Sequence, residues 1–484
     1  MTKNFDLTRD DLKQYPHFDA PISLKNIKRL VTSPDRVAKN SFYPLFLYHK
    51  SWQPFRLSDP LRPPKKIRPI RYGARRDAYI FSHYRNILSD LYEKKLHEMG
   101  ISLCPVAYRK IKRADGRGKC NIDFAKDAFD TIDSLGNCVA ICLDIKGYFE
   151  SLDHIQIKKI WCDLLGVNKL PSDHYAVFKN ITQYRYVDQK SVYTRLGYWG
   201  VLDPSKPLVE GLLKEIPTQI CTPQEFREKI CGLDEKSGPS LIEKNVHDYG
   251  IPQGAPISDI IANFYLLDFD KKINDFAKSK GGKYLRYSDD ILIILPNNSL
   301  DLTSVIALIS NEISKNGKNL AIKKEKTSIV EFSLKNGRLS NQPITYDGLI
   351  NNKDGLEYLG FRYDGRNVYV RESTVSRLFR KISTGAKKYA KKYVKDNPGK
   401  DIPALIDNFN FSIFYQKYGK VNKKDYAENN YKSWTFHSYI KRSCDVFGKK
   451  GKEIRKQFSN FQTFSREKIS KAIVVAWNKE NDIS

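Results

Sequence analysis

The sequence has 484 residues, of which 40% are hydrophobic, enough to fill the cores of two or three domains and too many for a disordered chain. Its formal net charge is +28, and its eight cysteines form no CxxC pair and no Cys/His cluster at zinc spacing. The first residues, MTKNFDLTRDDLK, contain no apolar signal-like run, and no stretch reaches the roughly 20 apolar residues of a membrane span. We therefore expect a reduced, cytoplasmic protein with no membrane partner.

The positive charge is concentrated in two outer segments of the chain. Residues 50–119 contain 18 Lys and Arg against 6 Asp and Glu, and residues 371–484 contain 26 against 11. The remaining residues are close to neutral as a group. Two basic segments around a near-neutral middle are typical of a protein that holds a polyanion on both sides of a working site. A merely solubilising surface would spread its lysines evenly, so the pattern favours a nucleic acid as partner.

The first third of the chain predicts a strand, two helices and a basic loop. Residues 1–50 mix short helical patterns with aromatic, extended segments and indicate no clear role. The basic run PPKKIRPIRYG is followed by apolar residues at helical spacing at 80, 84, 87, 88 and 91, which predicts a strand and then an amphipathic helix. CPVAYRKIKRADGRGKC at 104–120 predicts a strand and a Gly-rich basic hairpin, followed by a helix to about residue 134.

The middle of the chain begins with a continuous apolar run. VAICLDIKGYF at 139–149 carries Asp144 at the end of this run, which is typical of a strand covered on both faces. The next residues, SLDHIQIKKIWCDLL, predict a helix capped near Ser151. Residues 185–245 are polar and irregular and indicate an inserted or elaborated segment. A Gly/Pro-rich loop, GIPQGAP, then leads into an apolar helix.

The tetrad Tyr287-Ser288-Asp289-Asp290 lies in KYLRYSDDILIILP, between two apolar runs. This pattern predicts a hairpin that carries two adjacent carboxylates at its turn. Like charges held close together are energetically costly unless a cation neutralises them, so the pair indicates a bound divalent metal. An Asp-Asp pair is also common in ordinary turns, because Asp bonds its own backbone there. The tetrad therefore has to be interpreted together with the other motifs of the chain.

The rest of the chain continues the alternation and then turns helical. We expect a helix near 301–316, a strand at LAIKKEKTSIVEF and a short strand pair around GLEYLGFRYDGRNVYV. From 371 onward the sequence is helical, aromatic and basic, with FNFSIFYQKYG, YKSWTFHSYIKR and FSNFQTFSREK as its aromatic stretches. Interleaved aromatic and basic residues suit phosphate contacts and base stacking, although the same aromatics can form the core of a helical domain.

Five of these segments together resemble the palm motifs of reverse transcriptases. LDIKGYFESLDH, GIPQGAPISDIIANFYL, LRYSDDILIIL, LAIKKEKTSIVEF and GLEYLGF occur in that family's order and rough spacing, over about residues 60–370. The chain is most similar to the bacterial group of intron, retron and defence-associated enzymes. The resemblance implies an α+β right-hand polymerase with fingers, a ferredoxin-like palm sheet and a helical thumb. We expect an N-terminal extension (1–50), basic fingers (51–135), a palm (136–370) with an insert around 185–245, and a helical, basic thumb and C-terminal domain (371–484).

The implied reaction is RNA-directed DNA synthesis by attack of a primer 3′-hydroxyl on an α-phosphate, with two Mg²⁺ ions about 4 Å apart. Mn²⁺ is the alternative ion. Such ions need hard oxygen ligands, which carboxylates supply. Asp144 and Asp289 match the family's metal ligands and are expected on adjacent strands. The carbonyl of Ile145 would be a further ligand, and Asp290 would support the primer-side metal or the hairpin.

Other motif residues match positions that contact the incoming nucleotide and the primer. Phe149 matches an aromatic residue beneath the nucleotide sugar, where a ring collides with a 2′-hydroxyl and selects dNTPs. An ordinary core aromatic is the alternative for this residue. Gln253 and Gly254 match the family's nucleotide loop, in which glycine lets the backbone approach closely. Leu359 and Gly360 resemble the primer-grip turn, and a plain hairpin is their alternative.

Cations from the fingers should neutralise the triphosphate, because negative charge builds on the departing pyrophosphate. The candidates are Arg109 in AYRK and Arg68 or Lys66 in KKIRP, each equally suited to a template phosphate. Lys326 in KEKTS matches a family lysine proposed to protonate the pyrophosphate. A solvated strand edge is the other interpretation of Lys326.

The sequence shows no ribonuclease H motif set and no HNH-type nuclease signature. By fold-level analogy it looks most like abortive-infection and defence-associated enzymes. This implies dNTPs, an RNA template, a DNA product, a dedicated non-coding RNA, and a homo-oligomer or partner protein.

Five alternatives stay open: template-independent synthesis, protein-primed synthesis, RNA synthesis, a palm-fold cyclase and a catalytically silent RNA-binding defence module. Intact Asp144, Asp289 and Asp290 argue against the silent module. Phe149 argues against RNA synthesis, and the PQG loop argues against the cyclase.

Overall fold

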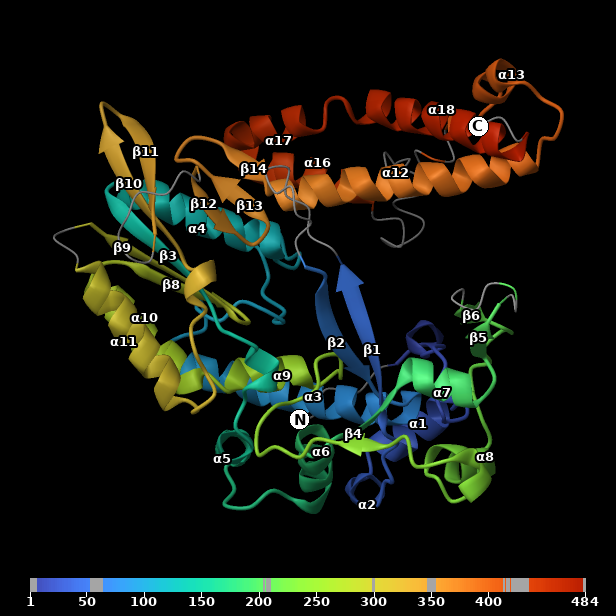
Figure 1. Cartoon of the computed structure of the whole chain (residues 1–484). Helices are drawn as coiled ribbons and strands as arrows, with labels where there is room; N and C mark the ends of the chain where they lie inside the picture. Colours follow the sequence, from blue (N-terminus) through green and yellow to red (C-terminus); the bar gives the residue numbers. More distant parts are fainter. Residues whose placement is uncertain are drawn as a thin grey trace.

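The computed structural model describes residues 7–52, 64–202, 205, 210–297, 301–345, 354–411, 414, 418 and 435–481. Figure 1 shows the palm strands beside a bundle of N-terminal elements, with two long C-terminal helices crossing above both. Much of the aromatic and basic stretch at 409–442 lies outside the described residues. Among the helices that are described, none is long and apolar enough to cross a bilayer.

The central sheet has five antiparallel strands in the order β11-β10-β3-β9-β8. Helix α10 precedes β8, and α11 precedes β10. Taken in chain order as strands 1 to 4, β3, β8, β9 and β10 lie in the sheet as 4-1-3-2, which is the ferredoxin-like arrangement, and β11 extends it. The elements are β3 (Cys138–Asp144), β8 (Lys283–Tyr287), β9 (Asp290–Pro296), β10 (Ser328–Lys335), β11 (Arg338–Ile344), α10 (Leu267–Ser279) and α11 (Leu302–Lys315).

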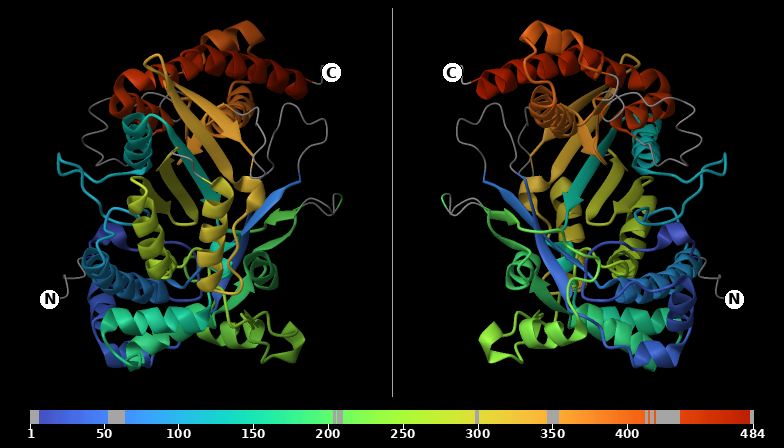
Figure 2. Two further views of the ribbon diagram at one scale, coloured as in Figure 1. Left: turned by 90° about the vertical axis from the view of Figure 1, so that its left-hand side faces the viewer. Right: turned by 90° about the vertical axis from the view of Figure 1, so that its right-hand side faces the viewer.

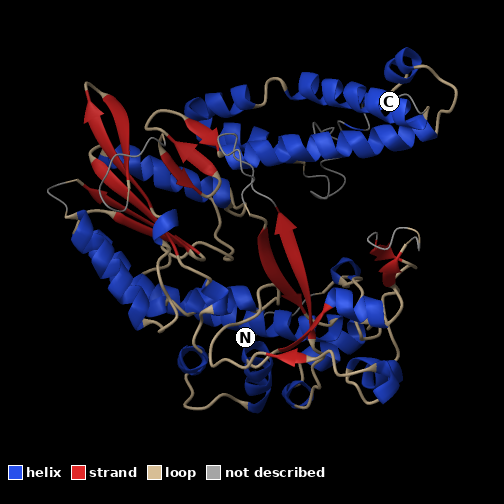
Figure 3. Cartoon of the chain, viewed as in Figure 1, coloured by secondary structure: helices blue, strands red, loops and turns tan. Residues whose placement is uncertain are grey.

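Both faces of this sheet are buried. Alternate residues of β3 point to opposite sides, so Val139 and Ile141 join the core under α10 and α11, whereas Cys138 and Ala140 join a second core under α4 (Asn121–Leu135). Figures 1 and 3 show α10 and α11 along one face of the sheet and α4 along the other. The prediction of a strand covered on both faces is confirmed.

A second, four-stranded sheet has the order β2-β1-β4-β7. The predicted strand and helix after residue 63 are confirmed as β2 (Lys66–Tyr72) and α3 (Arg75–Glu98). The other strands are β1 (Leu45–Trp52), β4 (Arg185–Asp188) and β7 (Glu243–Lys244). The remaining N-terminal and middle elements are α1 (Leu24–Val31), α2 (Pro34–Ala38), α5 (His154–Leu165), α6 (Ser172–Thr182), α7 (Gln189–Arg195), β5 (Trp199–Val201), β6 (Glu210–Leu212), α8 (Pro223–Glu225) and α9 (Ser258–Phe264).

The described residues of the segment at 185–245 pack against the N-terminal strands. β4 pairs in parallel with β1, and Val187 and Ile220 share a core with Phe18 and Phe46. Our sequence-based grouping followed chain order, and these contacts join residues more than a hundred positions apart. We therefore group this segment with the fingers.

The N-terminal residues brace the helix that follows β2. The carboxylate of Asp19 accepts hydrogen bonds from the backbone N–H groups of Arg75 and Arg76 at 3.3 and 2.8 Å, and so caps α3 from a distant part of the chain. The backbone N–H of His17 bonds the carbonyl of Thr218 at 3.0 Å, which ties the same segment to residues 218–220. Residues 1–50, whose role the sequence did not indicate, thus hold the fingers together where they are described.

His17 is fully buried among aromatic rings. Its Nδ1 accepts a hydrogen bond from the N–H of Phe18 at 2.9 Å. Burial, with the nearby Arg75 charge, lowers the pKa of His17 to about 3. A depressed pKa means that the folded state resists protonation, so the stability is complete above the unfolded pKa of 6.5 and is lost as the pH falls below it.

We expect His17 to make the protein less stable in mild acid. Between pH 8 and pH 5.5, one unit below the unfolded value, this residue alone should cost about 1.4 kcal/mol of unfolding free energy. In His17→Asn the amide oxygen replaces Nδ1 as acceptor, and that share of the pH dependence should disappear. Urea unfolding at the two pH values measures it, with exposed His247→Asn as the control. Equal pH dependence in wild type and His17→Asn would show that His17 is not responsible.

The C-terminal helices divide between two cores. α12 (Glu372–Lys395) and α18 (Phe461–Glu480) lie side by side with α13 (Ile402–Asp407), as Figures 1 and 2 show, and bury residues such as Ile382 and Ile473 against one another. α16 (Phe436–Phe447) and α17 (Lys452–Gln457) contribute Phe447 and Ile454 to the palm core instead. That core also includes β12 (Leu356–Tyr358), β13 (Phe361–Tyr363) and β14 (Val368–Val370).

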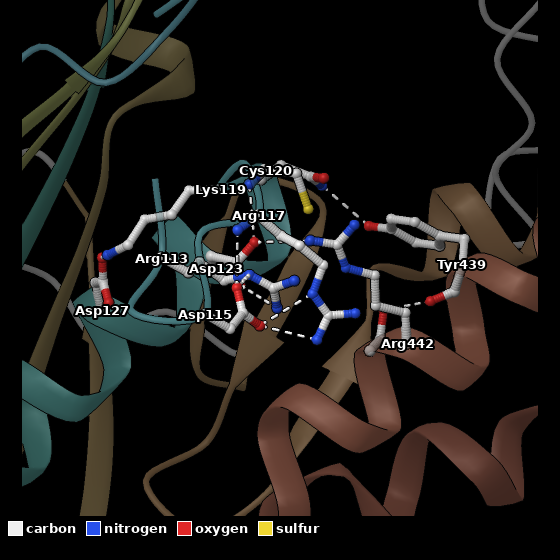
Figure 4. A network of polar contacts seen from close by, with 11 residues as sticks. Arg113, Asp115, Arg117, Lys119, Cys120, Asp123, Asp127, Tyr439 and Arg442 are labelled. Atoms are coloured by element: carbon white, nitrogen blue, oxygen red, sulfur yellow. Dashed lines mark hydrogen bonds and ion pairs between the residues drawn. The ribbon is translucent and has the colours of Figure 1, made fainter. Parts of the chain in front are cut away.

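A polar network joins α16 to the start of α4 (Figure 4). Asp123 accepts hydrogen bonds from Cys120 N at 2.8 Å and from Arg442 Nη2 at 3.1 Å, and Arg113 Nη1 lies 3.6 Å from its other oxygen. The predicted hairpin at 104–120 is reduced to single bridges, Lys112 with Gly118 and Pro105 with Arg286. Its arginines are thus partly used to fix the loop against α4 and α16.

Candidate active site

The tetrad forms the predicted hairpin. Tyr287 of β8 pairs with Asp290 of β9, which leaves Ser288 and Asp289 as a two-residue turn. Ser288 has a φ of +61°, a backbone conformation that non-glycine residues rarely adopt, and its side chain is 2% exposed. This strained turn sets the direction of the two carboxylates that follow it.

Asp144 lies beside this turn, on the adjacent strand. It is the last residue of β3 and is the register partner of Asp290, while the N–H of Ile145 bonds the carbonyl of Asp289 at 3.1 Å. The structure therefore brings Asp144, Asp289 and Asp290 together at one end of two neighbouring strands, as expected. In the sequence, Asp144 and Asp289 are 145 positions apart.

The three acids repel one another. Burial raises the pKa of Asp289, and the Asp144 charge adds to this effect, while Lys326 and Arg68 oppose it. Burial, followed by the charges of Asp289 and Asp144, raises the pKa of Asp290 to about 7. A divalent cation bound by these hard oxygen donors would offset the repulsion between them.

Lys326 supplies part of the missing charge. Its Nζ donates to both carboxylate oxygens of Asp144, at 2.8 and 2.6 Å. The residue lies in a short 3₁₀ turn, Lys324–Lys326, before β10, so the strand-edge interpretation does not describe its position. Its proposed role as a proton donor to pyrophosphate stays a prediction.

The donors present fit Mg²⁺ or Mn²⁺. Asp144 and Asp289 provide carboxylates, and no donor among the described residues bonds the carbonyl of Ile145, which is therefore available as a third oxygen. Within the same residues, no group of three or more His, Cys, Asp and Glu side chains is arranged to hold an ion. The oxygen donors assigned to the cations are therefore two carboxylates and one carbonyl, with Asp290 outside this set.

The predicted nucleotide loop lies against both Phe149 and the fingers. The N–H of Ile251 bonds the carbonyl of Phe149 at 2.8 Å, and the N–H of Arg71 in β2 bonds the carbonyl of Gln253 at 2.8 Å. Gly254 has a φ of +120°, and a Cβ there would lie 2.6 Å from the carbonyl oxygen of Arg71. Glycine is therefore required where the loop meets β2.

Phe149 is half-buried in a 3₁₀ turn, Tyr148–Glu150, directly after β3. The hydroxyl of Ser151 donates to the carbonyl of Gly147 at 3.0 Å and closes this turn. The helix cap that we expected near Ser151 lies two residues later. Asp153 caps α5, because its Oδ1 accepts from the N–H of Gln156 at 2.9 Å.

The predicted cations differ in their surroundings. Alternation along β2 puts Lys66 and Arg68 on one face, and the Arg68 charge offsets a small part of the raised pKa of Asp289. Arg109 is 5% exposed and is engaged with protein partners. Its guanidinium donates to the Glu93 carboxylate at 2.7 and 2.6 Å and to the carbonyls of Ser102 and Pro105 at 2.6 and 2.5 Å. It serves there as a brace and is not free for a triphosphate.

The primer-grip candidates Leu359 and Gly360 form the turn between β12 and β13, with φ values of +47° and +91°. Two positive φ values are typical of a tight two-residue hairpin turn. Asn121 Nδ2 donates to the carbonyl of Leu359 at 3.0 Å, which ties the turn to α4. Arg371 N–H bonds the carbonyl of Gly360 at 2.9 Å, and the Arg371 charge offsets a small part of the raised pKa of Asp290.

Sequence reasoning missed two charged residues beneath the turn, Arg286 and Asp270, and also the proximity of Arg371. Arg286 stands in LRYSDD at an inward position of an apolar strand, and both it and Asp270 are fully buried. A charged residue at an inward strand position was the signal available, because such a side chain must find a partner.

Residues 218–363 match the family model described as Reverse transcriptase (RNA-dependent DNA polymerase). The chain therefore carries a reverse transcriptase domain in an α+β right-hand fold. It is an RNA-directed DNA polymerase and so a nucleotidyltransferase. The matched segment contains Gln253, Asp289 and Lys326, while Asp144 and Phe149 lie before it.

Among solved structures, the apo telomerase of Candida tropicalis is 12% identical with a TM-score of 0.38, over 98% of this chain and 76% of that chain. The telomerase of Candida albicans in complex with a TWJ fragment of telomeric RNA is 13% identical with a TM-score of 0.36, over 91% and 67%. A TM-score below 0.5 is too low for this likeness to bear on the function. No curated protein sequence matches the chain.

Proposed function

We propose that the chain synthesises DNA from dNTPs on an RNA template by two-metal phosphoryl transfer, with Asp144 and Asp289 as the metal-holding carboxylates. The observation that carries the proposal is the pairing of β3 with β9, which sets Asp144 opposite Asp290 and bonds Ile145 to Asp289. Two Mg²⁺ ions, when bound, stabilise the attacking and leaving oxygens. Mn²⁺ is a substitute with the same ligand chemistry.

The chain's own residues have separate parts in this proposal. Asp144, Asp289 and the carbonyl of Ile145 hold the cations, and Asp290 adds negative charge on the primer side. Gln253 and Gly254 form the floor on which the incoming nucleotide lies, and Lys66 and Arg68 of β2 neutralise its triphosphate. Lys326 has to release Asp144 before its ammonium protonates the departing pyrophosphate.

The test is incorporation of labelled dNTPs by the purified chain with Mg²⁺, on a primed RNA template and on a matched primed DNA template. We expect extension on RNA, full dependence on a divalent ion, and loss of extension on addition of a chelator. Extension without any template would favour the template-independent alternative. A product covalently attached to the protein would favour protein priming.

Phe149 is proposed as the group that selects deoxyribonucleotides, and its contact with the Ile251 N–H supports a place beside the nucleotide loop. Phe149→Ala should raise ribonucleotide incorporation relative to deoxyribonucleotide incorporation by roughly 100-fold, because the smaller side chain leaves room for a 2′-hydroxyl. The ratio of kcat/KM for each rNTP and dNTP measures the change. Phe276→Ala, which truncates another half-buried Phe of the same core, is the control. An unchanged ratio in Phe149→Ala would assign the ring to packing alone.

We also propose a cytoplasmic role in antiviral defence with a dedicated non-coding RNA as template, together with a homo-oligomer or a partner protein. What supports this is the resemblance of the palm segments to defence-associated enzymes and the basic outer segments at 50–119 and 371–484. Sequencing the nucleic acid that co-purifies with the chain tests it. One enriched RNA with complementary DNA supports the proposal, and an unselective RNA population contradicts it.

A further inference from the structure

A fully buried ion pair lies directly beneath the aspartate turn. Arg286 of β8 and Asp270 of α10 are both 0% exposed. The guanidinium Nε and Nη2 donate to the two carboxylate oxygens of Asp270 at 2.7 and 2.6 Å, a bidentate pair. The hydroxyl of Tyr284 donates to the same carboxylate at 2.6 Å, so its geometry is fixed from two sides.

The rest of the Arg286 guanidinium contacts the backbone of the active site. Nη1 donates to the carbonyl of Ser288 at 3.1 Å, and Nη2 donates to the carbonyl of Asn263, the residue before the end of α9, at 2.9 Å. α9 follows the Gln253–Gly254 loop, and Ser288 immediately precedes Asp289. One side chain therefore connects the metal-ligand turn with the helix that carries the nucleotide loop.

Stability alone does not account for this pair. Taking two charges out of water costs about as much as their attraction returns, and an apolar pair of similar volume often serves the fold equally well. What an apolar pair cannot do is hold a carbonyl. Among the residues that the structure describes, Arg286 is the side chain that donates to the Ser288 carbonyl, and Ser288 is the residue with the unusual φ of +61°.

We propose that Arg286, oriented by Asp270, is a positioning residue that holds the Ser288 carbonyl and thereby sets Asp289 for metal binding. The importance of Arg286 for catalysis rests on the proposed function. Its effect on metal affinity can be measured without turnover. Asp270 orients the guanidinium, Arg286 fixes the turn, and Asp289 receives the cation. Neither Arg286 nor Asp270 contacts the substrate in this scheme.

The deciding variant is Arg286→Lys. A lysine keeps the positive charge and the pairing with Asp270, but its single ammonium cannot also bond the Ser288 and Asn263 carbonyls. Mn²⁺ binding to the nucleotide-free protein is measured by electron paramagnetic resonance titration, with Asp289→Asn marking the loss of the site. We expect the Mn²⁺ affinity of Arg286→Lys to fall by about 10- to 100-fold, the range typical of residues that orient metal ligands.

A steady-state assay provides the second readout. In Arg286→Lys we expect kcat to fall and the Mg²⁺ concentration for half-maximal activity to rise about tenfold, with the dNTP KM close to that of the wild type. A merely destabilised protein would lose active molecules without any change in its metal dependence. Arg75→Lys is the matched control, because Arg75 forms a buried pair with Asp19 in the fingers, at 3.4 Å, and has no contact with the turn among the bonds described. It should keep the wild-type Mn²⁺ affinity.

A double variant, Arg286→Met with Asp270→Leu, covers the case in which Arg286→Lys does not fold. It removes both buried charges together, so the fold should survive while the bond to Ser288 is lost. Thermal unfolding checks that it is folded, and its Mn²⁺ affinity should fall as in Arg286→Lys. Wild-type Mn²⁺ affinity in either folded variant overturns the proposal. If the wild type binds Mn²⁺ at Asp289 and Arg286→Lys weakens it, but no dNTP is incorporated, the proposed function fails and the positioning role stands.

Discussion

Asp289→Asn should lower the rate of dNTP incorporation by roughly 1,000-fold or more while leaving the protein folded. The amide has nearly the shape of the carboxylate but lacks the charge that a divalent cation needs. Asp289 lies at the turn between β8 and β9, and its carbonyl accepts a hydrogen bond from the N–H of Ile145, the residue directly after Asp144. Single-nucleotide extension on a primed RNA, measured under saturating enzyme, gives the rate.

Although its activity falls, Asp289→Asn should be at least as stable as the wild type when no metal is bound. The charges of Asp144 and Asp289 repel one another, which contributes to the raised pKa of Asp289, so removing one of them relieves the repulsion. We expect thermal unfolding of Asp289→Asn in chelator to occur at or above the wild-type temperature. Loss of activity together with retained or increased stability is typical of a residue kept for function.

Two further variants complete this experiment. Asp290→Asn should cost less activity, roughly 10- to 100-fold, because Asp290 is outside the set of Asp144, Asp289 and the Ile145 carbonyl. Asp268→Asn removes an exposed carboxylate from α10 and should match the wild type in rate. If Asp289→Asn incorporates dNTPs as fast as Asp268→Asn, the assignment of the active site is wrong.

The palm could be predicted because its signals are local. The run that ends at Asp144 is apolar at every position, and only a strand buried on both faces needs that pattern. The tetrad at 287–290 joins two strands, and a two-residue turn is the shortest way to connect them. Motif order then supplied the pairing of β3 with β9, which no local pattern contains.

The parts that could not be predicted depend on contacts between distant residues. The segment at 185–245 has too little apolar periodicity to show its partners, and contacts such as the pairing of Leu45 with Tyr186 place it with the fingers. Arg109 looked like a free cation because its partner Glu93 is sixteen positions away on α3. In the same way, the sequence does not distinguish Arg286 from other basic residues, because its contacts with Asp270 and the Ser288 carbonyl form only in the fold.

Gly254→Ala is the second change with a large expected effect. A methyl group at this position would lie 2.6 Å from the Arg71 carbonyl oxygen and 2.9 Å from Ile70 Cγ2, so the loop and β2 have to separate. The separation would also strain the 2.8 Å bond from Arg71 N–H to the Gln253 carbonyl. β2 carries Lys66 and Arg68, and a shift of about 1 Å in such a positioning element is expected to cost roughly 100-fold in kcat/KM for dNTPs.

The control for Gly254→Ala has to be another glycine with a positive φ, where an added methyl group meets no neighbouring atom. Gly166 provides this, because it has a φ of +67° at the end of α5 and no atom within 4 Å of the position a Cβ would take. Both alanine variants should lose stability, since each forces an L side chain into a backbone conformation with positive φ. Only Gly254→Ala should lose dNTP incorporation. If both retain wild-type kcat/KM, contact between the loop and β2 does not position the nucleotide, and Lys66 and Arg68 lose their proposed role with it.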